Sequence, residues 1–393
     1  MRILFNIIFS AILIIGLVGF WALFLNLWKP KKKWSAWVGY IIIIGAWFAA
    51  IRYYILNQVD LYGMMYYPLM NMFRIESYGF LFGVFLAIPV FIILSLLYWT
   101  INKIWSKTPE ENRTGRRAFF RTAATMVPLA TIGGSSYAAF AGQQELVVTH
   151  ESFGYTNLPP GLKNYKIVQL SDVHIGPSID LDDFDEILKL ALLQKPNRVV
   201  ITGDLIDKLE WLPEVCERLT TFAKQIPDGV DFILGNHEYH HDVNKVLDSF
   251  KRNTPMNILV NSNIQIMGGK QPVYIAGVAY DNNRKKDNRE AMINKALSGI
   301  PDYAFVILLA HHPEFFEESI ERKIPLTLSG HTHGGQIVLM GIPVVPIGTP
   351  YIKGRYVEEQ SVCYVNNGTG HWFPIRINCP REITVITFFD GVA

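Results

Sequence analysis

Long apolar runs fill the first third of the chain, and short apolar runs that end in polar residues fill the rest. Residues 3–28 are almost wholly apolar, which at 1.5 Å per helical residue is long enough to cross a bilayer. Residues 34–56 and 78–101 repeat this length, and Trp and Tyr lie near the ends of the runs, as in an aromatic belt. The pattern predicts an N-terminal multi-span α-helical membrane region over residues 1–145, with three or four transmembrane helices.

A fourth segment, residues 122–140, carries no charge but is only mildly apolar. It can be read as a further membrane helix next to a basic cluster. It also resembles a twin-arginine export signal, because residues 115–121 (Gly-Arg-Arg-Ala-Phe-Phe-Arg) precede it and cleavage could follow Ala141. We favour the membrane helix, since export signals normally begin a chain. Whether the segment spans, lies flat on the membrane or is cleaved stays open.

Lysine and arginine set the expected orientation, because such residues gather in cytoplasmic loops. The loop from residue 57 to residue 77 contains one basic residue, Arg74. The loops before and after it are rich in basic residues, namely Lys29, Lys31, Lys32 and Lys33 in one, and Lys103, Lys107, Arg113, Arg116, Arg117 and Arg121 in the other. These two loops are predicted to be cytoplasmic. If residues 122–140 span the membrane, the rest of the chain is extracytoplasmic, and this is the location that we expect.

Beyond residue 146, five short apolar runs each lead into residues of metal-binding types. Such runs are typical of strands buried in an α/β sheet, with a site at their carboxyl ends. An isolated Gly-Asp more often caps a turn, but five units in order favour one shared site. The runs are 166–170, 198–202, 231–234, 304–310 and 324–328, followed by polar residues 171–174, 203–204, 235–238, 311–313 and 329–335.

Composition narrows the remaining possibilities. Charged residues make up 18% of the 393 residues and the formal net charge is +2. No arginine-rich stripe or stacking platform is present in the sequence, so we expect no nucleic-acid partner. The three cysteines are too scattered for a zinc knuckle or a disulfide framework, although Cys363 and Cys379 could pair.

The ordered motifs Asp-x-His, Gly-Asp, Gly-Asn-His-Glu, His-His-Pro and Gly-His-Thr-His resemble those of the calcineurin-like metallophosphoesterases. The segment 330–336 and the tail from Asn367 to Thr384 are similar to a bacterial branch of membrane-associated and twin-arginine-exported phosphodiesterases. The resemblance covers about residues 146–390. It implies an α/β metallophosphoesterase domain over residues 146–393, built as a two-sheet β-sandwich flanked by helices, with the site on loops at one edge.

The resemblance also implies a ligand set for two divalent metal ions. Asp204 would bridge the two ions. Asp172, His174 and His333 would hold the first ion, and Asn236, His311 and His331 the second. Mixed His, Asp and Asn ligands fit Mn, Fe or Zn better than Ca or Mg. Two cations some 3.5–4 Å apart can neutralise a phosphate, make hydroxide available and orient in-line attack.

Three further histidines lie in or next to these motifs. His237 is the candidate general acid or phosphate-stabilising group, with the alternative that it only orients a metal ligand. His312 is expected to be a structural neighbour of His311. His371, in a glycine-rich loop, is a candidate substrate contact.

The function that these features predict is a membrane-anchored, metal-dependent phosphoesterase of the phosphodiesterase type, acting on lipid or cell-envelope phosphate esters. Its expected partners are the lipid bilayer and the phosphate-ester substrate. One alternative is a cytoplasm-facing pyrophosphatase that cleaves a nucleotide-linked lipid precursor. Another is a membrane sensor with an esterase-like binding module, which the intact ligand set disfavours.

Overall fold

The computed structural model describes Gly45, Phe48 and residues 67–391, apart from residues 105–109, 177, 281–284, 344–347 and 373–374. The predicted spans 3–28 and 34–56 therefore lie outside the described residues, except for Gly45 and Phe48. The chain divides into two compact units, residues 1–141 and 142–393, which we describe separately.

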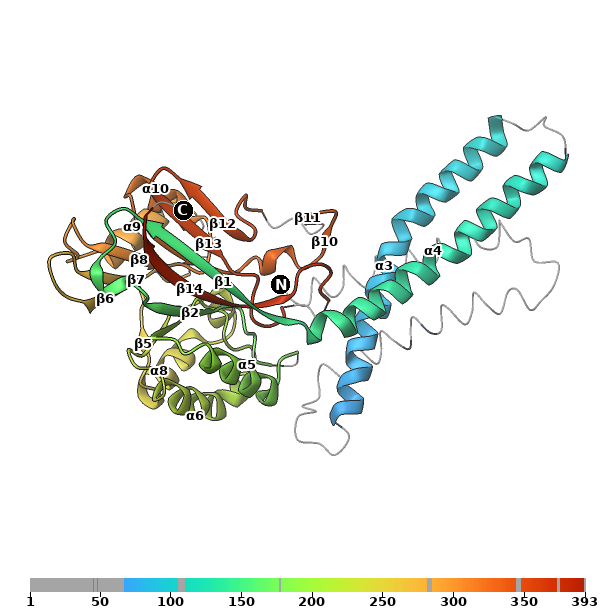
Figure 1. Ribbon diagram of the computed structural model, residues 1–393. Coiled ribbons are helices and arrows are strands. Elements are labelled where there is room, and N and C mark those ends of the chain that lie inside the picture. The colour runs from blue at the N-terminus through green and yellow to red at the C-terminus, as the bar shows by residue number, and fades with distance from the viewer. Residues whose placement is uncertain are drawn as a thin grey trace. The chain divides into compact units, whose positions relative to one another are not determined.

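Two long helices make up the described part of the first unit (Figure 1). Helix α3 (Tyr67–Ile104) contains the predicted span 78–101, with Pro89 inside it. Its segment Met70–Ile104 is long and apolar enough to cross a membrane, and among the described helices it alone meets that test. Helix α4 (Glu110–Gln144) contains the ambiguous segment 122–140. Both segments are confirmed as helical, while the multi-span arrangement stays a prediction.

The second unit contains the two predicted sheets, each with six strands (Figure 1). The first sheet has the order β1-β14-β2-β3-β4-β5 and the second β12-β13-β9-β8-β7-β6. The strands of the first sheet are β1 (Leu146–Tyr155), β14 (Arg381–Asp390), β2 (Lys166–Leu170), β3 (Arg198–Ile201), β4 (Val230–Phe232) and β5 (Asn257–Ile258). Those of the second are β12 (Gly354–Glu358), β13 (Ser361–Val365), β9 (Leu326–Ser329), β8 (Phe305–Leu309), β7 (Val273–Gly277) and β6 (Ser262–Met267), and β10 (Val338–Leu339) and β11 (Ile342–Pro343) form a separate ribbon.

A continuous hydrophobic core joins the two sheets. The first sheet contributes Ile167 and Val200 to this core, together with Ile233 directly after β4. The second sheet contributes Ile307 and Leu328. Strands β3, β8 and β9 are buried at every position, and their sequences are mostly apolar rather than alternating. The charged exception, Arg198 of β3, pairs with Asp231 at 2.9 Å.

Helices cover the outer faces of the sheets. Figure 1 shows α5 (Leu181–Leu193), α6 (Leu212–Ala223) and α8 (Val243–Asn253) beside the first sheet. Helices α9 (Lys286–Ala296) and α10 (Phe315–Glu321) pack on the second, where Ile293 and Phe315 join a cluster with Leu308. The short helix α7 (Asn236–His240) follows β4 directly, and three 3-10 turns lie at Pro160–Leu162, Leu209–Trp211 and His333–Gly335.

The five predicted strand-to-loop units correspond to β2, β3, β4, β8 and β9. Strands β2, β3 and β4 are parallel neighbours in one sheet, and β8 and β9 are parallel neighbours in the other. The buried side chain of Gln169 connects the two groups near their ends, because its Nε2 donates to Thr202 Oγ1 and to Ser329 O at 3.0 Å each. The loops after all five strands therefore meet at one edge of the sandwich.

Candidate metal centre

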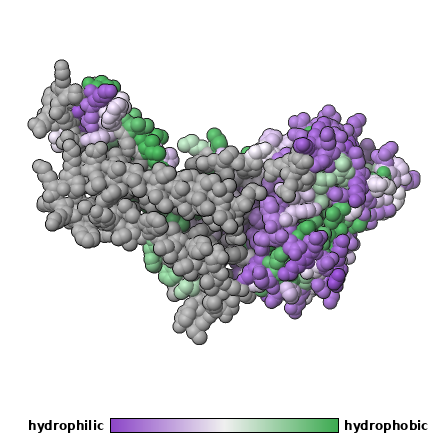
Figure 2. Space-filling model, turned by 180° about the vertical axis from the view of Figure 1, so that it is seen from behind, coloured by the Kyte–Doolittle hydropathy of each residue, from purple (hydrophilic) through white to green (hydrophobic). Residues whose placement is uncertain are grey.

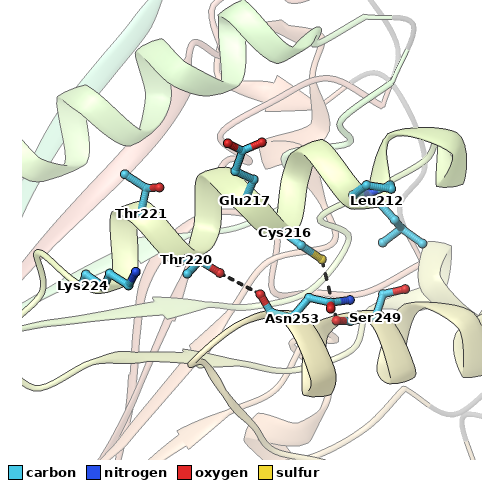
Figure 3. Close-up of a pocket in the computed structure, with 9 residues that line it drawn as sticks. Leu212, Cys216, Glu217, Thr220, Thr221, Lys224, Ser249 and Asn253 are labelled. Atoms are coloured by element: carbon cyan, nitrogen blue, oxygen red, sulfur yellow. Dashed lines mark hydrogen bonds between the residues drawn. The ribbon is translucent and has the colours of Figure 1, made fainter.

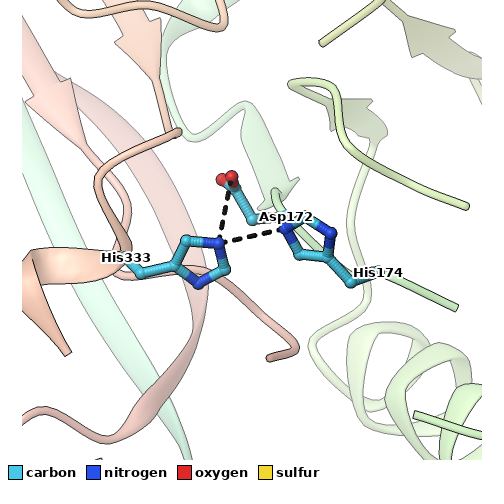
Figure 4. A group of neighbouring side chains, drawn as sticks. All are labelled: Asp172, His174 and His333. Carbon is cyan, nitrogen blue, oxygen red and sulfur yellow. Dashed lines mark hydrogen bonds and ion pairs between the residues drawn. The ribbon is translucent and has the colours of Figure 1, made fainter. Parts of the chain in front are cut away.

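Asp172, His174 and His333 form the first group of converging ligand atoms. Asp172 and His174 come from the loop after β2 and His333 from the loop after β9, and their side chains point toward one another (Figure 4). The Nε2 atoms of His174 and His333 lie 3.0 Å apart, and His333 Nε2 lies 3.5 Å from Asp172 Oδ1. All three residues are buried.

Asp204, His311 and His331 form the second group. His311 Nε2 lies 3.2 Å from Asp204 Oδ2 and 3.1 Å from Asn236 Oδ1. Asp204 Oδ2 also lies 3.8 Å from His174 Nε2 in the first group. Asp204 thus stands between the two groups, which is the position that a bridging ligand requires, and the fold brings all seven predicted ligands together.

The backbone at this edge is held in an uncommon conformation. Five of the seven predicted ligands have positive φ angles, namely Asp172 (52°), His174 (53°), Asp204 (51°), His331 (70°) and His333 (49°). A non-glycine residue in this region costs on the order of 1–3 kcal/mol, and such residues cluster at active sites and ligand clamps. The surrounding contacts stabilise a backbone geometry that the ligands alone would not adopt.

Two glycines of the motifs allow the loops to approach. A Cβ atom at Gly330 would collide with Ser171 Oγ and Asp172 Oδ2, and one at Gly235 would collide with Asp204 Oδ1. The sequence pattern Gly-His and Gly-Asn therefore has a packing reason, since any side chain at these positions would displace a predicted ligand.

Glu238, the last residue of the Gly-Asn-His-Glu motif, connects two of the loops. Its carboxylate is fully buried and accepts hydrogen bonds from the backbone N–H groups of Gly235 (2.7 Å), Asp204 (3.0 Å) and Leu205 (2.7 Å). It thereby fixes the loop after β3 against the loop after β4. The motif was recognised from the sequence, but this role was not.

Asp207 is a residue of the site that the sequence analysis missed. Its Oδ1 atom lies 2.7 Å from His237 Nδ1 and 3.3 Å from His174 Nδ1. His241 Nε2 lies 3.7 Å from the same oxygen. The only available signal was its position three residues after Asp204, because its histidine partners are distant in the sequence.

Arg376, within the tail from Asn367 to Thr384, is a second residue of the site whose role the sequence analysis did not predict. Its guanidinium is buried, and Nη2 lies 3.1 Å from His333 Nδ1 and donates to the carbonyl oxygens of Asn367 (2.9 Å) and Gly370 (2.8 Å). Nη1 donates to Cys379 O at 3.2 Å. Nη1 also donates to His333 O at 3.4 Å, so Arg376 fixes the backbone of this predicted ligand.

His371 and His312 are both buried. The loop that carries His371 is attached to the site by the backbone bonds Thr369 N to Ser171 O (2.6 Å) and Gly370 N to Asp172 O (3.0 Å). The role of His371 as a substrate contact stays a prediction. His312 packs against other rings of the site, at centroid distances of 3.7 Å from His331 and 5.1 Å from Tyr280.

Buried carboxylates give the site a strongly acidic character. Burial alone would raise the pKa of Asp204 and of Asp207, but neighbouring histidines hold both pKa values well below the usual range. Asp204 and Asp172 raise the pKa of His311 to about 10, and Asp204 and Asp207 raise that of His237 to about 9, against the opposing effect of burial. Anions that stabilise imidazolium in this way also attract divalent cations.

The donor set fits a pair of divalent metal ions. It combines imidazole nitrogens, carboxylate oxygens and the neutral oxygen of Asn236, which suits Mn, Fe or Zn. His174 Nδ1 and His237 Nδ1 both face Asp207, as is usual for ligand or catalytic histidines oriented by a carboxylate.

One groove in the described part of the chain has no connection to these ligands. A groove between α6 and α8 is lined by residues that include Cys216, Glu217, Thr220 and Asn253, none of them a predicted ligand (Figure 3). Its polar groups bond to each other, as in the 2.8 Å bond from Thr220 Oγ1 to Asn253 O. Cys363 and Cys379, which could have paired, are both free thiols.

Comparison with known proteins gives matches that centre on this edge of the sandwich. Residues 165–335 match the family model described as calcineurin-like phosphoesterase. An uncharacterized metallophosphoesterase of Campylobacter jejuni is 34% identical over 242 residues, which cover 58% of this chain and 60% of that protein. The uncharacterized metallophosphoesterase YkuE of Bacillus subtilis is 29% identical over 265 residues, or 65% of this chain and 90% of that protein.

The name of a relative from Danio rerio refers to a transmembrane protein. It is called a transmembrane protein with metallophosphoesterase domain, and it is 27% identical over 323 residues, or 77% of this chain and 71% of that protein. The chain spans 60% of the length of the Campylobacter jejuni relative and of two Helicobacter pylori relatives.

Proposed function

Because the chain belongs to the calcineurin-like phosphoesterase family, we propose that it is a membrane-anchored, metal-dependent phosphoesterase of the phosphodiesterase type. The observation that carries the proposal is the position of Asp204, whose Oδ2 lies 3.2 Å from His311 Nε2 and 3.8 Å from His174 Nε2. One carboxylate between two sets of nitrogen ligands is the arrangement of a dinuclear centre.

The predicted ligands form two sets, one for each metal ion. Asp172, His174 and His333 would hold one divalent cation, and Asn236, His311 and His331 would hold the other, with Asp204 shared. When bound, such a pair neutralises the anionic oxygens of a phosphodiester and makes hydroxide available near neutral pH.

His237 would then protonate the leaving alkoxide. Its backbone N–H donates to Asp204 Oδ1 at 2.8 Å, which fixes the residue beside the shared ligand. Its Nδ1 is occupied by Asp207, so Nε2 is the ring atom that faces away from that carboxylate and can reach a substrate oxygen. General acid catalysis by a positioned histidine contributes about 10²–10⁴-fold in rate.

Membrane anchoring is supported by the apolar helix α3 and by the name of the Danio rerio relative. Attachment to a bilayer raises the effective concentration of an enzyme toward substrates at the same surface. We therefore propose phosphate esters of lipids or of the cell envelope as the substrate class, with no nucleic acid as partner.

The test uses the full chain purified in detergent. We expect about two divalent ions per chain by elemental analysis, and hydrolysis of bis(4-nitrophenyl) phosphate with added Mn²⁺. Asp204→Asn serves as the inactive control. Tight metal binding without hydrolysis of any diester would contradict the proposal and favour a binding module.

A further inference from the structure

Helices α3 and α4 approach each other unusually closely at two glycines of α3. Gly79 and Gly83 are four residues apart in an otherwise apolar stretch. A Cβ atom at Gly79 would lie 2.6 Å from Ser136 Cα, and one at Gly83 would lie 2.5 Å from Ile132 Cα. This is the small-xxx-small contact by which helices associate inside membranes, where no hydrophobic effect drives them together.

Ser135 adds a polar bond to this contact. Its side chain is buried, and Oγ lies 2.6 Å from Gly79 O of α3 and 2.7 Å from Thr131 O of α4. A hydroxyl paired in this way can enter an apolar medium without the penalty of an unsatisfied polar group. Ser135 and Ser136, two of the residues that lower the hydropathy of α4, therefore lie at its contact with α3.

The two helices stay together over most of the thickness of a bilayer. Ser136 lies beside Gly79 at one end of the contact, and at the other end the rings of Tyr98 and Phe120 lie 5.2 Å apart. The helices are therefore antiparallel. The distance along α3 from Gly79 to Tyr98 is about 28 Å at 1.5 Å per residue, close to the roughly 30 Å of a hydrocarbon core.

Most of the exposed residues described within the uncharged stretches of both helices are apolar. More than half of the surface is exposed for Phe119, Met126 and Leu129 of α4, and for Ile92, Leu96 and Trp99 of α3. Figure 2 shows hydrophobic side chains at the surface of the described helical part, whereas the visible face of the phosphoesterase domain is mostly hydrophilic. Residues 77–101 and 122–142 contain no charged residue. Acyl chains are thus the partner that matches this surface in length and in chemistry.

We propose that α4 crosses the bilayer beside α3 as the second half of a membrane hairpin, and that the phosphoesterase domain begins on the extracytoplasmic side. Six basic residues lie where the two helices are joined, at positions 103, 107, 113, 116, 117 and 121, and only Arg74 lies toward the other end of α3. The positive-inside rule places the joined ends in the cytoplasm. Strand β1 begins at Leu146, two residues after α4 ends, so the domain follows on the opposite side.

This location narrows the substrate class of the proposed function, and the inference about substrates rests on that function. The domain would act on phosphate esters outside the cytoplasm and would have no access to nucleotide-linked precursors inside. The placement of the helices is independent of catalysis.

Three variants of the full chain, each with one added cysteine, test the hairpin in spheroplasts with a membrane-impermeant maleimide. Gly115→Cys and Gly134→Cys are a matched pair on α4, because a Cβ at either glycine meets no atom within 4 Å. Tyr303→Cys lies on the phosphoesterase domain, where Tyr303 is 65% exposed. The wild-type chain, whose three cysteines are buried, gives the background.

We expect Tyr303→Cys to be labelled in intact spheroplasts and Gly115→Cys only after permeabilisation. Gly134→Cys should resist labelling in both conditions and should exceed the labelling of the wild-type chain only after the membrane is dissolved in SDS, which also exposes the three native cysteines. Labelling of Gly134→Cys in permeabilised spheroplasts would show that α4 lies at the surface, and protection of Tyr303→Cys until permeabilisation would place the domain inside. Either result overturns the proposal.

The outcome can be separated from the proposed function. Hydrolysis of the bis-ester is measured on the same wild-type chain in detergent, where both sides of the membrane are accessible. A chain that is labelled as expected but is inactive would contradict only the proposed enzymatic activity. An active chain with the opposite labelling would contradict only the proposed membrane hairpin.

Discussion

Asp207 Oδ1 lies 2.7 Å from His237 Nδ1, although the two residues come from the loops after different strands, β3 and β4. The same carboxylate is 3.3 Å from Nδ1 of His174, a predicted metal ligand. One side chain therefore orients both the candidate general acid and a predicted ligand of the first metal ion. This couples the metal position to the position of the proton donor.

If His237 protonates the leaving group, His237→Ala should affect substrates unequally. We expect kcat for an alkyl phosphodiester to fall about 10²-fold or more, because an alkoxide needs a proton to leave. Bis(4-nitrophenyl) phosphate, whose leaving group is stable as an anion, should lose much less. Steady-state kinetics on both substrates, with metal content measured in parallel, checks this. Equal losses on both, or loss of metal, would contradict the role.

Asp207→Asn should show the same preference for good leaving groups, in a milder form. The amide cannot stabilise an imidazolium at His237 or orient His174 as a carboxylate does. Asp242→Asn, at the exposed N-cap of α8, is a matched control that removes a carboxylate from a nearby segment. A uniform change across substrates would mean that Asp207 has only a structural role.

Asp204→Asn removes the charge shared by the two groups of ligands. We expect turnover to become undetectable and the metal content to fall from about two ions per chain toward one. Elemental analysis after dialysis and hydrolysis assays measure the two effects. Normal activity in this variant would rule out the bridging assignment.

Arg376→Met should weaken metal binding without contact with the metal. The guanidinium donates to the backbone carbonyl oxygen of His333 and connects this residue to the loop at Asn367 and Gly370. Loss of such an outer partner typically costs about 10–100-fold in metal affinity. Competitive metal titration gives the affinity, and the Co²⁺ absorption spectrum reports the ligand geometry. Arg252→Met, at an exposed position on α8, is the control. Unchanged affinity and spectrum in Arg376→Met would refute the positioning role.

The N-terminus of α5 should make stability depend on pH. Burial and the neighbouring carboxylate of Asp180 raise the pKa of Asp183 to about 6, above the roughly 3.9 of an unfolded aspartate. The folded state therefore binds this proton more tightly, and the stabilisation that is full below about pH 4 is lost as the pH rises through about 6.

The Asp183→Asn variant should lack this pH-dependent loss of stability. The free energy of unfolding of the variant, relative to wild type, should increase as the pH rises from about 4 to about 6, as measured by urea unfolding in detergent. Asp182→Asn, in the same turn and exposed, is the control. A constant difference across this range would contradict the assignment.

The sequence alone determined the features that local patterns encode. Uninterrupted apolar runs specify buried strands, so β2, β3, β4, β8 and β9 were predicted close to their observed bounds. The ligand-type residues at the strand ends specified the site, because parallel strands bring their carboxyl ends to one edge. The helical state of residues 78–101 followed from length and hydropathy in the same way.

Tertiary structure decided what depends on partners distant in the sequence. Asp207 is an ordinary acidic residue until the fold brings it to His174 and His237, and Arg376 is an ordinary arginine until it is buried against His333. Hydropathy left segment 122–140 ambiguous because it averages over all faces of a helix. The structure separates those faces, with Ser135 and Ser136 against the glycines of α3 and apolar side chains outward, and this separation is a property of the packed pair rather than of either sequence.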